Sequence, residues 1–546
     1  MKQLRVKHHL RWLSAATALA LALPFMGLSR VSHAEEGEKV LKVQVEVEVA
    51  SLDTAVATDG TSFEVLANMI DGLYEPDASG QAVPALVESE EVNEAGTEYR
   101  FKLKEAKWQN GTPVTAHDFV FSWQRLCDPE THSEYSYMVE TAGVKNAAAV
   151  IAGEKKPEEL GIHAEDDQTL VVELDFPVPF FHSLMYFPIF YPINQEFFES
   201  TNGQYATSPE TFLANGAFTL KSYEPAATSF ELEKNPDYYN AERIKLDGLQ
   251  YQVIKDNQAA ALAFNSGEVD ITRLGGEQVD LYKEDPAFQT IRGGYLWYMA
   301  VNQKVSGFES THMRKAVVMS IDKQNICDTV LKDGSVPANF AVPIDLATGP
   351  DGKDFRDSAG SYLEFDAEAA KEEFAKAKEE LGKDSFQFEM IYEDTEASTN
   401  VAQKIKEMVE SNLEGVEISL KQMPKKNRIQ LTSAKDFEIS LTRWGPDYAD
   451  PMTYLALWTT DAPYNYGSWS NEEYDKIVKS CQDGELSLDQ AARWEALHEA
   501  EKIAMEDAVI LPVYQVGGAY MIAENVHDVH FHSVALNRVY KDAYMD

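Results

Sequence analysis

The first regular pattern of apolar and polar positions lies at residues 43–49, where four valines alternate with Gln44 and two glutamates. This period of two predicts a strand with one buried face. FEVLANMIDGL, residues 63–73, follows with apolar residues at helical spacing. A strand and then a helix are therefore expected near the start of the folded chain.

Further short elements are predicted up to residue 271. Residues 97–111 are typical of a strand and a turn, and 115–126 of a helix in which Thr115 and Asp118 form a capping box. Residues 216–240 predict two strands joined by a turn, and 255–271 a helix followed by a short strand. Between them, the aromatic segment 176–194 contains four prolines, too many for a regular helix.

The C-terminal half has the pattern of an α/β domain. Residues 385–393, 416–423 and 436–444 each predict a strand, and 401–413 predicts a helix. A helical connection between strands favours a parallel pair. Farther on, the long helix predicted at 489–507 precedes AVILPVYQVGGAYMI, residues 508–522, which predicts two more strands.

RWGPDYADP, residues 443–451, begins where the last of the three strands ends. Its glycine and prolines predict a loop, and ligands of open α/β sheets bind beyond the carboxyl ends of strands. Asp447 and Asp450 could be an acid/base pair, but that requires a raised pKa on one of them. Recognition of a positive charge is the other reading of these carboxylates.

Residues 1–34 have the pattern of a cleavable export signal. A basic start with Lys2 and Arg5 precedes an apolar run from Trp12 to about Leu28, and Ser32-His33-Ala34 gives small residues at the cleavage positions. No cysteine lies near that site, so we expect a free protein in the periplasm, without a lipid anchor.

The length of 546 residues predicts two or three domains. The formal charge of −42 argues against nucleic acid and anionic membranes as partners. Such acidity favours cationic ligands, and it also keeps a secreted protein soluble in salt; the second explanation is the simpler one.

No catalytic or metal-binding motif emerges from the sequence. His498-Glu499 lacks the second histidine of a zinc protease helix, and Asp351, Asp354 and Asp357 lack calcium-loop spacing. The three cysteines lie far apart and allow at most one disulfide; core packing or idle surface thiols explain them. They are Cys127, Cys327 and Cys481. We therefore expect no enzyme activity, no cofactor and no metal.

Several blocks together resemble one family, the oligopeptide-binding proteins of ATP-driven importers (solute-binding protein family 5), especially those of the enterobacterial type. The blocks occur in the family's order from Ser51 to the last predicted strands. They are residues 66–92, 99–129 (YRFKLKEAKWQNGTPVTAHDFVFSWQRLCDP), 216–251, 262–271, 313–326 and 444–455 (WGPDYADPMTYL).

The resemblance implies an α/β, two-lobed, three-domain periplasmic binding protein fold (type II, family 5 cluster), with a hinge between the lobes. Domain I would be discontinuous, built from residues 35–70, 199–297 and 512–546. Domain II would span 71–198 and domain III 298–511. A ligand would be enclosed between the lobes and released on reopening.

The resemblance also implies a ligand site. A bound peptide would pair its backbone with protein strands, and Asp447 would meet its α-ammonium. Arg443 and Gly445 would pair with the peptide backbone, and Trp444 would form a wall of the pocket. The remaining expected ligand-binding residues are Thr58, Asp59, Gly60, Tyr135, Trp297 and Tyr514; for Trp297 and Tyr514, core packing is an equal alternative.

The chain departs from its best-known relatives at the peptide's C-terminal end. Their basic residues there fall on Ser398, Thr432 and Leu441. Substitutes could come from Lys425, Lys426, Arg428 or Arg443, although a solvated helix face is the favoured reading of the first three.

These observations predict a monomeric periplasmic receptor that delivers short peptides to the permease subunits of an ABC importer. A murein peptide or dipeptide receptor of the same fold is the alternative, and a secreted hydrolase or chaperone-like protein the alternative from another class. Peptide length, side-chain preference and the permease stay open.

Overall fold

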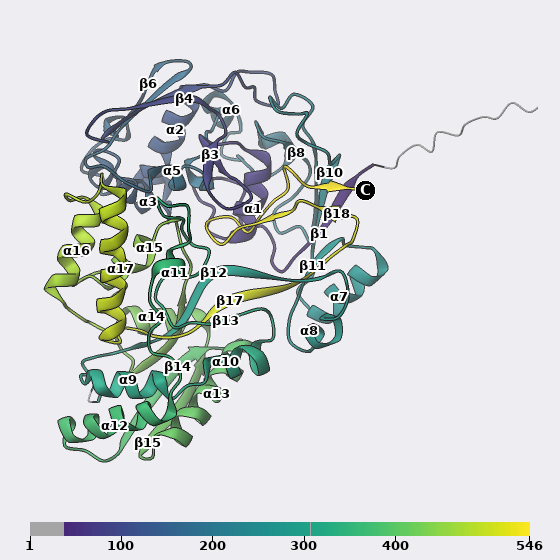
Figure 1. The fold of residues 1–546 in the computed structure, drawn as a ribbon. Helices are drawn as coiled ribbons and strands as arrows, with labels where there is room; N and C mark the ends of the chain where they lie inside the picture. The colour runs from purple at the N-terminus through teal and green to yellow at the C-terminus, as the bar shows by residue number, and fades with distance from the viewer. Residues whose placement is uncertain (1–37, 306) are drawn as a thin grey trace, which may run out of the picture. The chain divides into compact units, whose positions relative to one another are not determined.

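The structure, a computed structural model, describes residues 38–305 and 307–546. The expected export signal, 1–34, lies outside the described residues. All helices and strands belong to one unit, Lys39–Asp546, with mixed α/β architecture (Figure 1).

Eleven strands of the described chain join in one mixed sheet. From edge to edge its order is β15 (Val416–Met423), β14 (Phe386–Glu393), β16 (Ile439–Trp444), β12 (Phe288–Val301), β17 (Leu511–Ile522), β11 (Ile271–Leu274), β1 (Val40–Val45), β10 (Gly248–Val253), β9 (Ser229–Lys234) and β8 (Phe218–Ser222), with β13 (Val336–Pro337) also paired to β17.

The parallel pairing expected in the C-terminal half is confirmed. β14 pairs in parallel with β15 over its whole length and with β16 at Met390 and Ile391. The connecting helix α13 (Glu396–Asn412) packs against β14 and β15 (Figure 1). Its Val401, Ile405 and Val409 are buried, as the helical spacing predicted.

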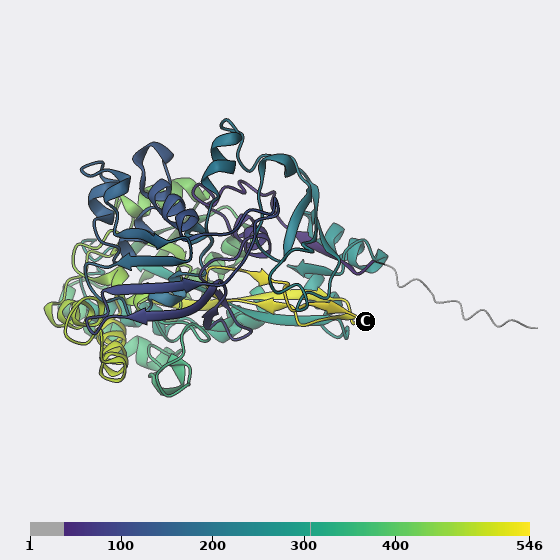
Figure 2. The same ribbon diagram turned by 90° about the horizontal axis from the view of Figure 1, so that it is seen from above.

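The prediction of two strands within 508–522 is wrong, because β17 runs unbroken from Leu511 to Ile522. Gly517 and Gly518 stay in the ladder opposite Arg292 and Ile291. A side chain at Gly517 would stand 2.2 Å from the backbone of Gly334, so glycine permits a close approach here. The yellow β17 runs beside the teal β12 in both ribbon views (Figures 1 and 2).

The alternation at residues 43–49 predicted a longer strand than the structure contains. β1 ends at Val45, and Val47 is 49 % exposed. Gln44, expected on a polar face, is buried. Its side-chain amide has a partner there, because it donates to the Ile254 carbonyl at 2.7 Å. β1 lies inside the large sheet between β10 and β11, and residues on both of its faces, Val43 and Gln44, are buried. Strict alternation was therefore not required of it.

A second sheet lies outside the first. Its order is β4 (Val87–Val92), β5 (Glu98–Leu103), β7 (Thr169–Glu173) and β6 (Ile162–Asp166). Helix α2 (Ala116–Cys127) packs against it and begins with the expected capping box. The proline-rich segment 176–194 contains only single turns, including α5 (Phe181–Leu184). The other described helices of nine or more residues are α1 (Gly60–Met69), α7 (Asn257–Ser266), α9 (Thr311–Met319), α12 (Ala367–Leu381), α14 (Lys425–Ser433), α16 (Glu472–Gln482) and α17 (Gln490–Glu506).

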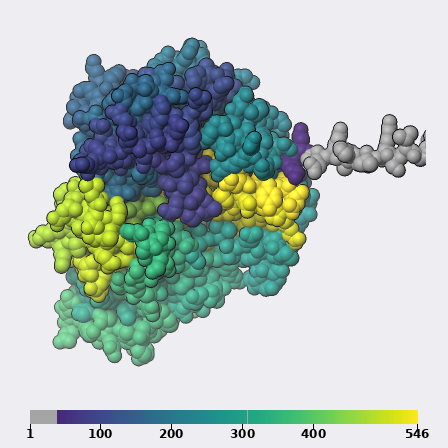
Figure 3. Space-filling view, turned by 45° about the horizontal axis from the view of Figure 1, so that its top comes forward, coloured from purple at the N-terminus to yellow at the C-terminus, as the bar shows by residue number. Residues whose placement is uncertain are grey.

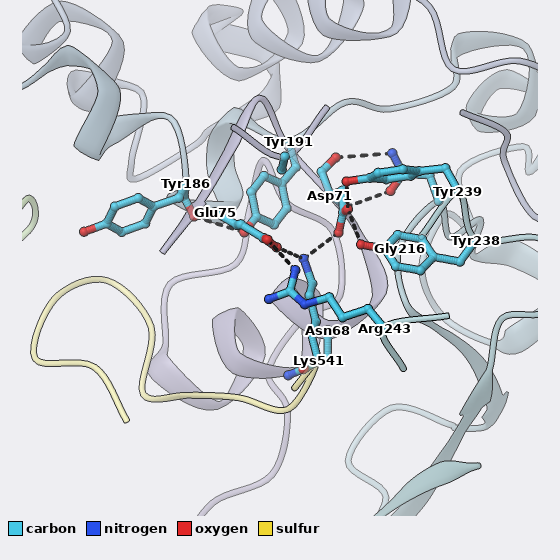
Figure 4. Close-up of polar contacts among 12 residues, drawn as sticks. Asn68, Asp71, Glu75, Tyr186, Tyr191, Gly216, Tyr238, Tyr239, Arg243 and Lys541 are labelled. Atoms are coloured by element: carbon cyan, nitrogen blue, oxygen red, sulfur yellow. Dashed lines mark hydrogen bonds and ion pairs between the residues drawn. The ribbon is translucent and has the colours of Figure 1, made fainter. Parts of the chain in front are cut away.

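A buried ionic network joins the C-terminus to segments from the first half of the chain (Figure 4). The Lys541 ammonium donates to Asp71 at 2.6 Å and to Glu75 at 2.8 Å. The hydroxyls of Tyr238 and Tyr239 donate to the same Asp71 carboxylate at 2.8 and 2.9 Å. Each charge has a partner, which makes its burial tolerable.

Candidate functional site

The loop after β16 places two carboxylates in different surroundings. The Asp447 backbone N–H donates to the Thr453 hydroxyl at 3.0 Å. Its carboxylate has no hydrogen bond or ion pair with any described residue. Burial raises the pKa of Asp447 to about 7. A half-buried carboxylate without a partner among the described residues favours a cationic group beside it.

Asp450, three residues later, is paired inside the protein. Both of its carboxylate oxygens accept hydrogen bonds from the Arg493 guanidinium at 2.8 Å, and both side chains are buried. One of these oxygens also accepts the Met452 N–H at 2.9 Å. These contacts give Asp450 a structural role in shaping the loop.

Asp447 lines a cavity of about 150 Å³. Five of the ten residues expected to bind ligand meet there: Thr58, Gly60, Tyr135, Gly445 and Asp447. The other walls are Phe63, Phe187, Gly293, Gly294, Tyr295, Pro446 and residues 532–537, which we call the C-terminal loop. The site thus draws on the beginning, the middle and the end of the folded chain.

The C-terminal loop is held by the short pair β19 (His530–Phe531) and β20 (Arg538–Val539). Its first three residues also border a neighbouring chamber of about 700 Å³. That chamber is lined by polar groups that include Gln81, Arg292 and Asp345. The loop therefore separates a small space at Asp447 from a larger one. In Figure 3 the last segments of the chain (yellow) reach the surface between earlier ones.

The remaining expected ligand residues lie around the cavity. Asp59 caps α1, where its carboxylate accepts the Ser62 N–H at 3.0 Å. The Trp444 ring lies 4.6 Å from that of Tyr464. Arg443 lies over the rings of Tyr295 and Trp297, at 5.6 and 5.1 Å.

Trp297 and Tyr514 face each other across β12 and β17. Their rings stack with centroids 5.7 Å apart, and both side chains are buried in the core beside β14 and β16. Neither of them lines the cavity at Asp447. Core packing describes their position in this structure.

The family of the chain follows from a match to a family profile. Residues 81–466 match "Bacterial extracellular solute-binding proteins, family 5 Middle". The chain belongs to this family. The family consists of substrate-binding proteins, and its fold is the two-lobed periplasmic binding protein fold, in agreement with the α/β architecture.

Relatives of this family 5 protein match at least nine tenths of its length. It is 30% identical over 523 residues to the dipeptide-binding protein of Lactococcus lactis, covering 93% of this chain and 94% of the relative. It is 28% identical over 508 residues to the oligopeptide-binding protein OppA of Bacillus subtilis, covering 90% of each.

Solved structures agree with the fold. The oligopeptide ABC transporter substrate-binding domain of Bacillus anthracis has a TM-score of 0.75 and 38% identity, covering 93% of this chain and 99% of that one. Listeria monocytogenes OppA bound to peptide has a TM-score of 0.75 and 34% identity, with the same coverage. Escherichia coli OppA is 26% identical, so the expected closeness to the enterobacterial type has only loose support.

Arg428 corrects one expectation. The sequence favoured a solvated helix face for residues 425–428, yet Arg428 is 3% exposed. It donates to the Thr442 hydroxyl at 2.6 Å and lies 3.6 Å from Glu393, which is also 3.9 Å from Arg443. Lys425 is exposed, as expected. α14 turns its Arg428 side toward β14, a tertiary contact that helical periodicity alone does not reveal.

Sequence reasoning missed several site residues. Phe63 and Phe187 were assigned to a helix face and to an irregular aromatic strip, and both line the cavity. Tyr295 lies two residues before Trp297 in β12, so alternation places both on the same strand face, and Arg443 lies over both rings. This spacing is a local signal that could have found Tyr295. No local signal marks the C-terminal loop, because only the folded chain brings it to Asp447.

Other features of the described residues bear on function. Cys127, Cys327 and Cys481 are buried and unpaired, which favours core packing over surface thiols. Within residues 38–305 and 307–546, no group of three His, Cys, Asp or Glu side chains is arranged to hold a metal. None of the described helices has the length and apolar character of a membrane span.

Proposed function

We propose that this protein binds short peptides at Asp447 and delivers them to the permease subunits of an ABC importer. Relatives that match at least nine tenths of its length are named dipeptide- and oligopeptide-binding proteins, which supports peptides as the ligand class. In this proposal it acts in the periplasm as a monomer, without a cofactor and without catalysing a reaction.

The observation that carries the proposal is the Asp447 carboxylate, which lines the cavity and has no partner among the described residues. An unpaired buried charge is costly, and a ligand ammonium removes that cost. A peptide's α-ammonium is the group that every unmodified peptide offers. Recognition through it would not depend on side-chain sequence.

The edge of β16 offers a place for the peptide backbone. β16 pairs with β12 along Ile439–Trp444, whereas its pairing with β14 stops at Ser440. One edge beyond Ser440 therefore has no strand partner among the described residues. An extended peptide added there would form main-chain hydrogen bonds with Arg443 and Gly445, as in strand addition.

The domain division stays part of the proposal. With domain I at 35–70, 199–297 and 512–546, the C-terminal loop and Gly60 belong to one lobe and Asp447 to the other, in domain III at 298–511. The cavity would then open whenever the lobes separate, which gives a route for ligand entry and release.

Titration calorimetry with a tripeptide, its N-acetylated form and the Asp447→Asn variant tests the proposal. Loss of the carboxylate should cost about 2–5 kcal/mol of binding free energy, as for one partner of a buried charge pair. N-acetylation should cost a similar amount. Asp461→Asn, at an exposed aspartate, is the matched control. Unchanged affinity in Asp447→Asn would refute the assignment.

Native mass spectrometry of protein purified from its host separates the alternatives. A mixture of short peptides supports the proposal, whereas one defined muropeptide supports the murein receptor. Prolonged incubation of the protein with peptides should leave them intact; cleavage products would indicate a hydrolase.

A further inference from the structure

The cavity at Asp447 has a feature that recognition of a primary ammonium does not use. Four aromatic residues line it, Phe63, Tyr135, Phe187 and Tyr295, which we call the aromatic cage. Three of them are in mutual contact, with ring centroids 4.9 Å apart for Phe63–Phe187, 5.6 Å for Phe63–Tyr135 and 5.5 Å for Tyr135–Phe187. They form one continuous aromatic wall of the cavity.

The charge of the cavity has a single source. Among the described residues that line it, Asp447 is the one acidic side chain, and none is a lysine or arginine. His532 also borders the cavity, but burial and the nearby His530 lower its pKa to about 4, so it is neutral at pH 7. The cavity therefore combines one negative charge with aromatic rings, the composition of sites for alkylated ammonium groups.

The size of the cavity fits more than an ammonium nitrogen. Its volume is about 150 Å³, and a water molecule in the liquid occupies about 30 Å³. A bare ammonium, about as large as one water, fills a small part of this space. A trimethylammonium group has four heavy atoms and occupies a larger share of this space.

We propose that the cavity accepts ligand ammonium groups that carry N-methyl substituents, up to a quaternary trimethylammonium. This inference rests on the proposed binding of peptides through their amino end, and it names N-methylated peptides as a ligand class. A primary ammonium has three N–H groups that need acceptors. A trimethylammonium has none, and it is held by the Asp447 charge and by contact with ring faces.

Calorimetry with three forms of one tripeptide tests the proposal: the free amine, the N,N,N-trimethyl form and the N-acetyl form. The trimethyl peptide should bind within about threefold of the free amine or more tightly, because ring contacts offset the lost N–H bonds. A loss of affinity greater than threefold would overturn the proposal, and would show that water fills the space around the ammonium. Binding of none of the three would refute the proposed function itself.

Two variants at one position test the role of the rings. Tyr135→Leu removes a ring of the cage, whereas Tyr135→Phe keeps it and loses only the hydroxyl. We expect Tyr135→Leu to weaken the trimethyl peptide about three- to tenfold more than the free amine, and Tyr135→Phe to preserve the ratio of the two affinities. This ratio does not depend on the fraction of folded protein. An equal ratio in Tyr135→Leu and the wild type would overturn the role of the rings.

Discussion

Two aspartates three residues apart in one loop have opposite roles because of their partners. Asp450 is neutralised by Arg493 inside the protein, whereas the Asp447 carboxylate has no partner in the described part of the chain. The sequence shows that both lie beyond the end of a strand. It does not show which one faces Arg493, since that arginine lies in α17 and is brought near only by folding.

The raised pKa of Asp447 predicts how binding depends on pH. Burial raises this pKa to about 7 in the free protein, and a bound ammonium would lower it. The complex then holds fewer protons than the free protein, so affinity rises with pH up to about 7, and it falls again above about 8, where the peptide's own α-amino group loses its proton. Below 7, we expect affinity for a free-amine peptide to fall about tenfold per pH unit.

Calorimetry between pH 5 and 8 measures this dependence. An N-acetylated peptide is the control, because it carries no ammonium to pair with Asp447 and should show no such slope. A flat profile for the free-amine peptide would contradict the pairing.

Asp450→Asn should lower the stability of the fold and leave Asp447, the carboxylate proposed to bind ligand, in place. Arg493 is 1% exposed, so the variant leaves an uncompensated buried charge. We expect a loss of about 3–5 kcal/mol in the free energy of unfolding, measured by urea denaturation. Asp461→Asn should change it by less than about 0.5 kcal/mol. Similar losses in both variants would contradict the importance of this pair.

At the scale of elements, the sequence predicted the helices and strands whose apolar residues recur regularly. It failed where strand pairing, and not the local pattern, decided where a strand begins or ends. The strand, helix and strand at 385–423 have local patterns that match their burial, and all three formed. β17 passes through Gly517–Gly518 because pairing with β12 continues there. β1 stops at Val45 although its pattern continues, because β10 and β11 pair with it no farther.

Gly294 in β12 allows the C-terminal loop to close the cavity. A side chain at Gly294 would stand 2.1 Å from the Ser533 carbonyl and 2.7 Å from Pro446. Gly294→Ala should displace the loop, lower the free energy of unfolding by about 1–3 kcal/mol and weaken ligand binding. Thermal unfolding and calorimetry measure the two effects.

Gly293→Ala is the matched control for this substitution. Its added carbon would meet chiefly the Val516 side chain, at 2.9 Å, which can move more easily than backbone. We therefore expect Gly293→Ala to lower the free energy of unfolding less than Gly294→Ala does. Gly294→Ala that is no more destabilising than Gly293→Ala would contradict the role assigned to Gly294.

At the scale of the whole molecule, the network around Lys541 makes the free energy of unfolding fall at low pH. Burial alone would raise the pKa of Glu75, but Lys541 and Arg243 hold it at about 2. A carboxyl group with a lowered pKa stabilises the fold above its unfolded pKa, near 4.5, and this contribution is lost as the pH falls toward 2.

Urea unfolding at several pH values measures the contribution of Glu75. Between pH 5 and 2 the wild type should lose about 3 kcal/mol more than Glu75→Gln. Glu91→Gln, at an exposed position in β4, should behave as the wild type. Parallel curves for the wild type and Glu75→Gln would contradict the assigned role.

The route of the chain through the site makes its last residues decisive for closing the cavity. Thr58 and Gly60 come early in the chain, Asp447 much later, and the C-terminal loop almost last. Arg538 and Lys541, which anchor the residues after this loop to Glu64 and Asp71, follow it. A chain cut before residue 532 would therefore keep the Asp447 carboxylate but lose the wall that closes the cavity, and we expect it not to retain ligand.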